Sequence, residues 1–352
     1  MLPSPKYRLY PHTGSLDHGG LAAGEVKIST TRDAASEPLL RVRDLTVRLG
    51  RTSAVTDLSF EVFPKEFLGI VGESGSGKSV TAKAILGLLP PSAQVSGSVT
   101  FRGQELIGAP PEVLRRIRGD QIGLVFQDAL AALDPVYTIG DQLVEALQAH
   151  RNISRKAARA QAADLLGEVK IPNPHKRLDD YPHQLSGGQR QRVIIATALI
   201  AEPDLIIADE PTTALDVTVQ KQVLDLLAEV SESREASVIL VTHDMGVVAQ
   251  HCHRVATFYG GLLVEGADVY TLFEQPRHPY TKALLRSVPR LGDTTPFEAI
   301  PGLPARITKP LDGCPFAPRC QHVADICTQG LPPEYYDGDH RHRCVRVGRG
   351  EL

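Results

Sequence analysis

The sequence has no long hydrophobic run. None of its apolar stretches approaches the roughly 18 residues that a membrane-spanning helix requires. The first residues include Lys6 and Arg8, but no apolar stretch follows them, as it would in a secretory leader. We therefore expect a cytoplasmic chain that reaches a membrane only through partner proteins.

The sequence also has no excess of positive charge. Its 38 Lys and Arg residues stand against 41 Asp and Glu residues, and the formal net charge of -3 argues against a nucleic-acid partner. Hydrophobic residues make up 42% of the chain and charged residues 22%, as in folded globular proteins. The length of 352 residues allows two domains of ordinary size, or one large domain with additions.

Periodic patterns are absent from residues 1–37, where Pro, Gly, His and Ser mix, and we expect a disordered lead-in there. Short β-like runs between Leu39 and Phe63 predict an antiparallel piece. Residues 128–185 predict a helical insertion, with GDQLVEALQAH and SRKAARAQAADLLGEVK as helices. LIIAD (205–209) and SVILVT (237–242) each follow a helical stretch, which indicates a parallel sheet with crossover helices.

A glycine-rich stretch, GESGSGKS, lies between the apolar run Phe67–Val71 and a segment with apolar residues at helical spacing. The main-chain N–H groups of such a loop can ring a phosphate, Lys78 would reach the β and γ phosphates, and Ser79 would hold Mg2+. A glycine turn with a chance lysine is the alternative, which the flanking strand and helix disfavour. No second loop of this kind occurs, so we expect one nucleotide unit. The residues expected around the nucleotide phosphates are Gly72, Ser74, Gly75, Ser76, Gly77, Lys78, Ser79 and Val80.

Two further strands end in reactive side chains. Asp209 closes LIIAD and is followed by Glu210, while His243 follows SVILVT. Ligands of open parallel sheets bind beyond the carboxyl ends of the strands, so these groups are expected near the phosphate loop. Asp209 is then a second Mg2+ contact, and Glu210 polarises water for attack on the γ-phosphate. The alternatives are that Asp209 and Glu210 are a surface pair of carboxylates without a catalytic role, and that His243 is a structural histidine.

A second glycine-rich stretch, QLSGGQRQR (184–192), precedes the apolar helical run VIIATALI. Ser186, Gly187 and Gly188 stand where a helix N-terminus presents free N–H groups to an anion. A helix cap is the simpler explanation. However, a second phosphate-facing motif is redundant beside Lys78 and Ser79, which suggests that this one faces a nucleotide on another chain.

The order of GESGSGKS, Gln127 in VFQD, LSGGQ, LIIADE, ALD at 214–216 and His243 resembles that of ATP-binding-cassette (ABC) ATPases over residues 38–270. The resemblance implies an α/β fold: a RecA-like P-loop ATPase core with an antiparallel β subdomain and a helical insertion. It also implies that two cassettes enclose two ATP molecules. In such a pair His243 would hold the γ-phosphate. The other residues with implied roles are Gln127 as an Mg2+ contact and as the link from Mg2+ and water to the helical subdomain, Ser186, Gly187, Gly188 and Gln189 as contacts of the partner's ATP, and Asp216 at the dimer interface.

One position departs from that family. ABC ATPases usually stack adenine on an aromatic residue near the position of Leu49. Here no aromatic residue stands between Leu40 and Phe60. How the base is held is therefore left open by the sequence.

The tail narrows the resemblance. PRHPYTKALLRSVP (276–289) and GCPFAPRC (313–320) resemble the C-terminal signature of dipeptide and oligopeptide permease ATPase subunits, a group that includes nickel and some oligosaccharide importers. This implies two membrane permease subunits, a second and similar ATPase subunit, and an external solute-binding protein. The expected role is ATP hydrolysis for import, at the cytoplasmic face of the cell membrane.

Two other functions are weighed against that role. A soluble ABC ATPase acting on ribosomes or DNA would usually carry two cassettes or a long coiled coil, and neither is present. A purely regulatory nucleotide-binding subunit would tolerate loss of catalytic residues, whereas Lys78, Asp209, Glu210 and His243 are all in place. The transported substrate is not named by this sequence, because the ATPase subunit does not touch it.

Four of the five cysteines lie in the expected C-terminal extension, residues 271–352, with the spacing C-x5-C-x6-C-x16-C: Cys314, Cys320, Cys327 and Cys344. A reducing compartment argues against disulfides. Four thiolates suit zinc or an iron–sulfur cluster, and the close C-x2-C pair usual for structural zinc is missing. Similarity to the peptide-permease ATPases also favours a 4Fe–4S cluster. Zinc, with a nearby histidine such as His322, and no metal at all stay open. Cys252 is expected to be a packing residue.

Overall fold

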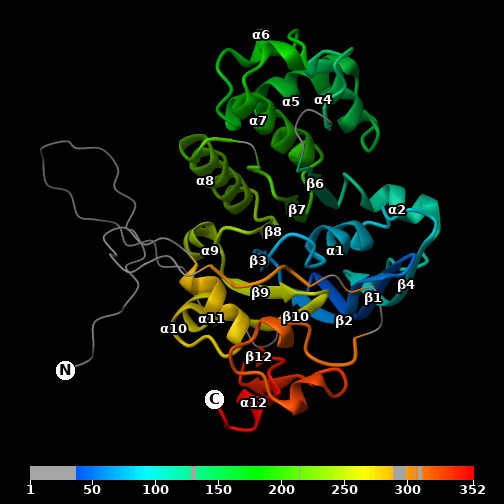
Figure 1. Ribbon diagram of the computed structural model, residues 1–352. Coiled ribbons are helices and arrows are strands. Elements are labelled where there is room, and N and C mark those ends of the chain that lie inside the picture. The colour runs from blue at the N-terminus through cyan, green and yellow to red at the C-terminus, as the bar shows by residue number, and fades with distance from the viewer. Residues whose placement is uncertain (1–36, 128–131, 214, 288–298, 306, 308–310) are drawn as a thin grey trace, which may run out of the picture.

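Two sheets and the helices around them form the computed structural model (Figure 1), which describes residues 37–127, 132–213, 215–287, 299–305, 307 and 311–352. The expected disordered lead-in therefore lies outside the described residues, except for Glu37. Residues 128–131 of the expected helical insertion and Ala214 of the ALD motif also lie outside them.

The smaller sheet is antiparallel, in the order β2-β1-β4-β5. Its inward side chains, such as Val42, Leu45 and Val47 of β1, alternate with partly exposed ones, as a half-buried sheet requires. The antiparallel piece predicted between Leu39 and Phe63 is confirmed. The strands are β1 (Leu40–Leu49), β2 (Thr52–Val62), β4 (Ala93–Phe101) and β5 (Gln104–Glu105).

The larger sheet has eight strands in the order β11-β12-β10-β9-β3-β8-β7-β6. From β9 to β6 the neighbours pair in parallel, and β10, β12 and β11 add antiparallel pairs at the other edge. The predicted parallel strands LIIAD and SVILVT are confirmed as β7 and β8. The bounds are β3 (Phe67–Val71), β6 (Ile122–Val125), β7 (Leu205–Asp209), β8 (Ser237–Thr242), β9 (Arg254–Tyr259), β10 (Leu262–Asp268), β11 (Tyr335–Asp337) and β12 (His340–His342).

The central strands are buried on both faces. Alternate residues of β8 belong to different hydrophobic clusters: Val238 and Leu240 pack in one, and Ile239 and Val241 in the other. A parallel sheet covered on both faces reads as a continuous apolar run for this reason. The covering helices are α1 (Lys78–Ile85), α2 (Pro111–Ile117), α7 (Gly187–Leu199), α8 (Val217–Ser233), α9 (Met245–His251), α10 (Val269–Glu274) and α11 (Pro279–Arg286).

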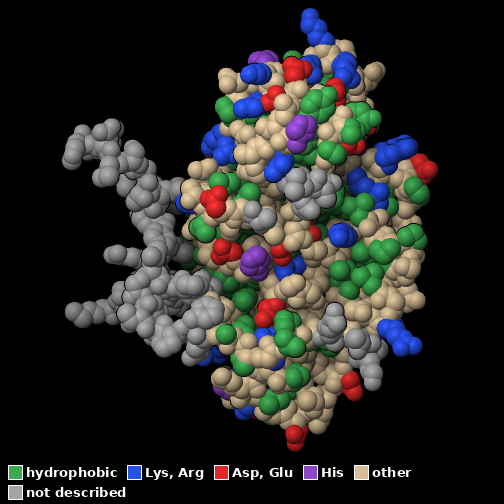
Figure 2. Space-filling model, turned by 45° about the horizontal axis from the view of Figure 1, so that its top comes forward, with side chains coloured by type: hydrophobic (Ala, Val, Ile, Leu, Met, Phe, Trp, Pro, Cys, Tyr) green, Lys and Arg blue, Asp and Glu red, His purple; other side chains and the backbone are tan. Residues whose placement is uncertain are grey.

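A helical subdomain stands apart from the sheets, at the top of Figure 1. Side-chain caps from Thr138 and Ser154 begin its two longer helices, α4 (Ile139–Gln148) and α5 (Arg155–Glu168), which confirms the helices predicted from GDQLVEALQAH and SRKAARAQAADLLGEVK. Two short turns follow, α6 (Pro174–Arg177) and η1 (Pro182–Gln184). Figure 2 shows basic and acidic side chains interspersed over this end of the molecule.

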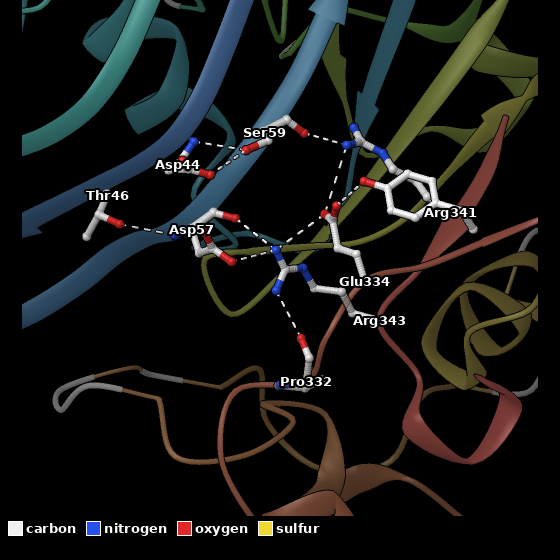
Figure 3. A network of polar contacts seen from close by, with 9 residues as sticks. Asp44, Thr46, Asp57, Ser59, Pro332, Glu334, Arg341 and Arg343 are labelled. Carbon is white, nitrogen blue, oxygen red and sulfur yellow. Dashed lines mark hydrogen bonds and ion pairs between the residues drawn. The ribbon is translucent and has the colours of Figure 1, made fainter. Parts of the chain in front are cut away.

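The C-terminal segment is joined to both sheets. Strand β12 pairs with β10 and so extends the larger sheet. At the smaller sheet, Arg343 donates to Asp57 Oδ2 at 2.7 Å, and Arg341 donates to the carbonyl of Ser59 at 2.6 Å (Figure 3). The expected boundary between residues 270 and 271 falls inside α10, and the domain limits stay a prediction. The remaining elements are η2 (Ala317–Arg319), η3 (Asp325–Thr328) and α12 (Val345–Gly348).

Within the described residues, every helix is too short or too polar to cross a membrane.

Candidate nucleotide site

The glycine-rich loop connects β3 to α1, as the sequence predicts. Gly72 and Gly77 have φ values of +150° and +105°, a region open to glycine and strained for other residues. At Gly72 an added Cβ would lie 2.2 Å from the carbonyl oxygen of Phe258. Lys78 folds back across the loop, where its Nζ donates to the carbonyls of Gly72 at 2.7 Å and Glu73 at 3.0 Å. The loop is thus closed around its own lysine.

Two of the three groups expected to hold Mg2+, Ser79 and Asp209, are hydrogen-bonded to each other, while the third, Gln127, contacts Glu210. Ser79, in the first turn of α1, donates from Oγ to Asp209 Oδ1 at 2.8 Å, and Asp209 ends β7. Burial raises the pKa of Asp209, and the hydrogen bond from Ser79 opposes that rise. A hydroxyl and a carboxylate oxygen at one place are ligands that suit Mg2+. The donor set therefore fits the predicted ion.

Glu210 is held at the centre of several expected site residues. Its backbone has a φ of +47°, and its N–H donates to the carbonyl of Val241 at 2.9 Å. Its Oε2 accepts from Gln127 Nε2 at 3.1 Å and lies 3.9 Å from His243 Nδ1. Thr213 also donates to Oε2 at 3.1 Å. The structure thus brings Gln127, Glu210 and His243 together. The sequence analysis did not predict Thr213 as a site residue. The sequence feature that could have indicated it is its hydroxyl, three residues after Glu210.

Lys78 is the buried cation of the site. Its side chain is 4% exposed, and Nζ lies 4.0 Å from Glu210 Oε1. Burial lowers the pKa of Lys78, and the carboxylates of Glu210 and Asp209 oppose this. A buried ammonium is costly without an anion. A phosphate brought to the loop would supply one.

The LSGGQ residues begin helix α7. Ser186 is the N-cap: its Oγ accepts from the N–H of Gln189 at 3.3 Å, and Gln189 Oε1 accepts from the N–H of Ser186 at 3.1 Å. Gly188 packs closely on α8, since an added Cβ would lie 2.6 Å from Val219 Cγ1, whereas Gly187 has more room. Asp216 likewise caps α8, accepting from the N–H of Val219 at 3.0 Å. No hydrogen bond or ion pair made by the described residues joins Ser186–Gln189 to the phosphate loop.

The position expected near the adenine base carries no aromatic ring. Leu49 ends β1, and its neighbours across the sheet are Thr52 and Ala93. The structure therefore gives no stacking partner at this register for the base.

The four C-terminal cysteines line one cavity with His278 and Phe316. The N–H of Cys314 donates to the carbonyl of Cys327 at 2.8 Å, and burial raises the pKa of Cys314 to about 12. All cysteines are free, and within the described part of the chain no three His, Cys, Asp or Glu side chains are placed to hold one metal ion. The four cysteines therefore line the same cavity, as the predicted iron–sulfur cluster requires, but they are not arranged around one centre as its ligands would be. Cys252, buried at the end of α9, packs in the core as predicted.

Known proteins place the chain in the same class. A family model described as "ABC transporter" matches residues 55–213. The dimeric ATP-binding cassette MJ0796, solved with ADP and Pi, is 30% identical to the chain, with a TM-score of 0.59 over 65% of this chain and 98% of that one. The fold and the site together define an ATP-binding cassette.

The C-terminal segment is more specific, since a model described as "Oligopeptide/dipeptide transporter, C-terminal region" matches residues 264–327. The chain is 48% identical to the dipeptide transport ATP-binding protein DppD of Bacillus subtilis, over 88% of this chain and 94% of DppD. It is 44% identical to the oligopeptide transport ATP-binding protein OppD of Escherichia coli, over 88% and 94%. The chain belongs to the ABC transporter ATP-binding proteins of the oligopeptide and dipeptide permease family. It spans about half the length of the OppD of Mycobacterium tuberculosis, to which it is 49% identical over 88% of this chain and 52% of that protein.

Proposed function

We propose that this chain hydrolyses MgATP to drive import of peptides or a related solute. One observation supports this above the others: Ser79, Asp209 and Glu210 meet beside the buried Lys78, beyond the carboxyl ends of the parallel strands β3 and β7, which lie on either side of β8. That arrangement supplies a phosphate ligand, an Mg2+ site and a base within one small region. The relatives are named transport ATP-binding proteins, which supports a role of this ATP hydrolysis in transport.

Different residues of the chain have different roles in ATP hydrolysis. Lys78 and the loop N–H groups bind the β and γ phosphates, while Ser79, Asp209 and Gln127 would hold Mg2+. The bound Mg2+ supplies positive charge that offsets the charge on the phosphates. Glu210 accepts a proton from the attacking water. Gln127 and Thr213, which donate hydrogen bonds to Glu210, orient it, and His243, which lies 3.9 Å from it, holds the γ-phosphate.

The LSGGQ segment acts on a second cassette. Ser186–Gln189 form a helix N-terminus with no phosphate contact in their own chain among the described residues. The capping box uses the N–H groups of Ser186 and Gln189, so those of Gly187 and Gly188 serve a partner's ATP. Asp216, at the start of α8 beside this segment, lies at the same interface. The partner is a copy of this chain or a similar subunit, and a similar subunit fits the permease family better.

The chain works as a peripheral subunit on the cytoplasmic face of the cell membrane, with two permease subunits and an external solute-binding protein. The helical subdomain offers exposed apolar side chains for such contacts: Val136 is 70% exposed and Tyr137 53%. A soluble ATPase without transport partners and a regulatory nucleotide-binding subunit are the alternatives. Co-purification of this chain with permease subunits would favour the transporter role over both alternatives.

The four-cysteine segment is proposed to hold a 4Fe–4S cluster. Cys314, Cys320, Cys327 and Cys344 line one cavity, and four thiolates are the usual ligand set. The four thiols are not grouped around one centre in the described residues, so they would have to move closer together to hold a cluster. Such a cluster would tie distant points of the segment to one centre and so stabilise its fold.

The hydrolysis proposal is tested with two variants of the purified protein. Glu210→Gln should lower kcat by roughly 100-fold or more while ATP still binds, because the amide keeps the shape but is no base. Lys78→Ala should weaken ATP binding itself. Steady-state phosphate release and calorimetric titration with ATP measure the two effects. Parental hydrolysis by Glu210→Gln would show that the role of Glu210 is misassigned.

The cluster is tested by purification without oxygen. We expect about four iron and four acid-labile sulfide per chain in the parent, and loss of both in Cys320→Ser. About one zinc per chain would support the alternative metal instead. A well-folded anaerobic parent without iron and sulfide would reject the cluster, whatever its ATPase activity.

A further inference from the structure

The guanidinium of Arg319 contacts the phosphate loop from outside all the nucleotide motifs. Its Nη1 lies 2.6 Å from Glu73 Oε2, and its Nη2 lies 3.1 Å from Glu73 Oε1. Only 5% of the Arg319 side chain is exposed. Glu73 is the second residue of GESGSGKS, directly after Gly72. The C-terminal segment therefore reaches the loop at the point where the loop leaves β3.

Further contacts fix this guanidinium in one orientation. Its Nε donates to the carbonyl of Pro301 at 2.7 Å, and Nη2 donates to the carbonyl of Ile300 at 3.2 Å. Its Cζ lies 5.8 Å from the ring centre of Tyr259. The hydrogen bonds to Glu73 raise the pKa of Arg319, so the group is charged throughout the physiological range. A planar, always charged fork suits a carboxylate better than lysine does.

The backbone of Glu73 has anchors of its own. Its N–H donates to Tyr280 Oη at 2.9 Å, and its carbonyl accepts from Lys78 Nζ at 3.0 Å. Tyr280 in turn packs on Tyr259, with ring centres 4.5 Å apart. The loop backbone is thus held by α11 and by the lysine. The part of Glu73 that Arg319 controls is the carboxylate.

An unpaired carboxylate at this point would oppose phosphate binding. The carbonyl of Glu73 accepts a hydrogen bond from Lys78 Nζ at 3.0 Å, so a phosphate held by Lys78 would lie close to the negative charge of the Glu73 side chain. We infer that Arg319 is a positioning residue for nucleotide binding, which holds the Glu73 carboxylate against the C-terminal segment and cancels its charge. The inference rests on the proposed function, because it concerns the same phosphate loop.

The first test removes the guanidinium. Arg319→Ala should raise the Kd for MgATP and the KM about tenfold, with kcat within about twofold of the parent, because one uncompensated charge is left beside the phosphates. The Kd and KM of Arg319→Lys should lie between those of the parent and those of Arg319→Ala, because lysine keeps the positive charge but lacks the planar guanidinium. Calorimetric titration with ATP in the presence of Mg2+ and steady-state kinetics measure these values.

The second test separates charge compensation from a merely structural contact. Adding Glu73→Gln to Arg319→Ala removes the uncompensated carboxylate, so ATP affinity should return to within about threefold of the parent. A structural role predicts no such rescue, because the double variant still lacks every contact of the guanidinium.

Arg343→Ala is the matched control. Arg343 is also buried, with 6% of its side chain exposed, is paired with Asp57, and directly precedes a cysteine of the four-cysteine segment, as Arg319 does. This variant should lower the melting temperature but leave the Kd for MgATP unchanged. Equal loss of affinity in both arginine variants, or no rescue by Glu73→Gln, would overturn the inference. A parent that does not bind ATP would instead contradict the proposed function.

Discussion

Single glycines of the phosphate loop differ in the room around them. At Gly72 an added Cβ meets the carbonyl oxygen of Phe258 at 2.2 Å and Ser76 Oγ at 2.9 Å. At Gly75 nothing lies within 4 Å, although its φ of +78° also disfavours a side chain. Among the described protein atoms, the first position is therefore restricted by packing against the backbone, whereas the second is restricted by its own conformation.

The two alanine variants should separate these causes. Gly72→Ala must displace either β9 or the loop, so we expect the Kd for ATP to rise by roughly 100-fold or more. Gly75→Ala carries only the strain of a left-handed residue, about 1–2 kcal/mol, and should cost a correspondingly smaller part of the affinity. Calorimetric titration with ATP compares them. Equal affinities would contradict the packing argument at Gly72.

At the scale of elements, the start of α7 has two duties. Its capping box, Ser186 with Gln189, stabilises the helix, and under the proposed function the same N-terminus contacts a partner's phosphate. Aspartate caps a helix about as well as serine, but it brings a negative charge. A substitution at Ser186 can therefore preserve the helix while opposing the ligand.

Ser186→Asp should keep the melting temperature and the Kd of the chain's own loop for ATP, yet lower turnover by about tenfold or more through repulsion of the partner's phosphate. Ser186→Thr is the control, since it keeps a cap without charge. Ser186→Ala should cost about 1 kcal/mol of stability. Turnover of Ser186→Asp at the parental rate would show that this terminus faces no phosphate.

Several elements were predicted from the sequence and others were not. The strands LIIAD and SVILVT and the helices α4 and α5 follow from apolar runs and periodicity in their own segments. Strands β9 and β10 were not predicted, although both are almost wholly buried. A local signal was present for both strands, because Gly260 and Gly261, with φ values of +54° and +79°, form a two-residue turn between them. The pairing of β9 with β3, where Leu68 lies opposite Arg254, joins segments far apart in the sequence and has no such signal.

For the whole molecule, the proposed function requires two cassettes. The Glu210→Gln protein should form an ATP-dependent dimer, because bound ATP stays intact and is contacted by Ser186–Gln189 of the other copy. Light scattering with and without MgATP measures the mass. Ser186→Asp in the same background should stay monomeric.

The expected light-scattering result differs if the second cassette belongs to another subunit. If this chain pairs with a similar ATPase, the dimer should appear only in the mixture. Monomers in both experiments, at ATP concentrations that saturate the site, would contradict pairing through LSGGQ.

The chemistry of the candidate nucleotide site could be predicted from the sequence alone, because each of its main motifs is a short contiguous segment. GESGSGKS, LIIADE and LSGGQ each place reactive groups at the end of one strand or the start of one helix, where local patterns are informative. Tertiary structure decided what surrounds those parts. The bond of Arg319 to Glu73 spans 246 positions, and that of Gln127 to Glu210 spans 83. No periodicity encodes such contacts, since they depend on how the C-terminal segment and the helical subdomain pack against the sheet.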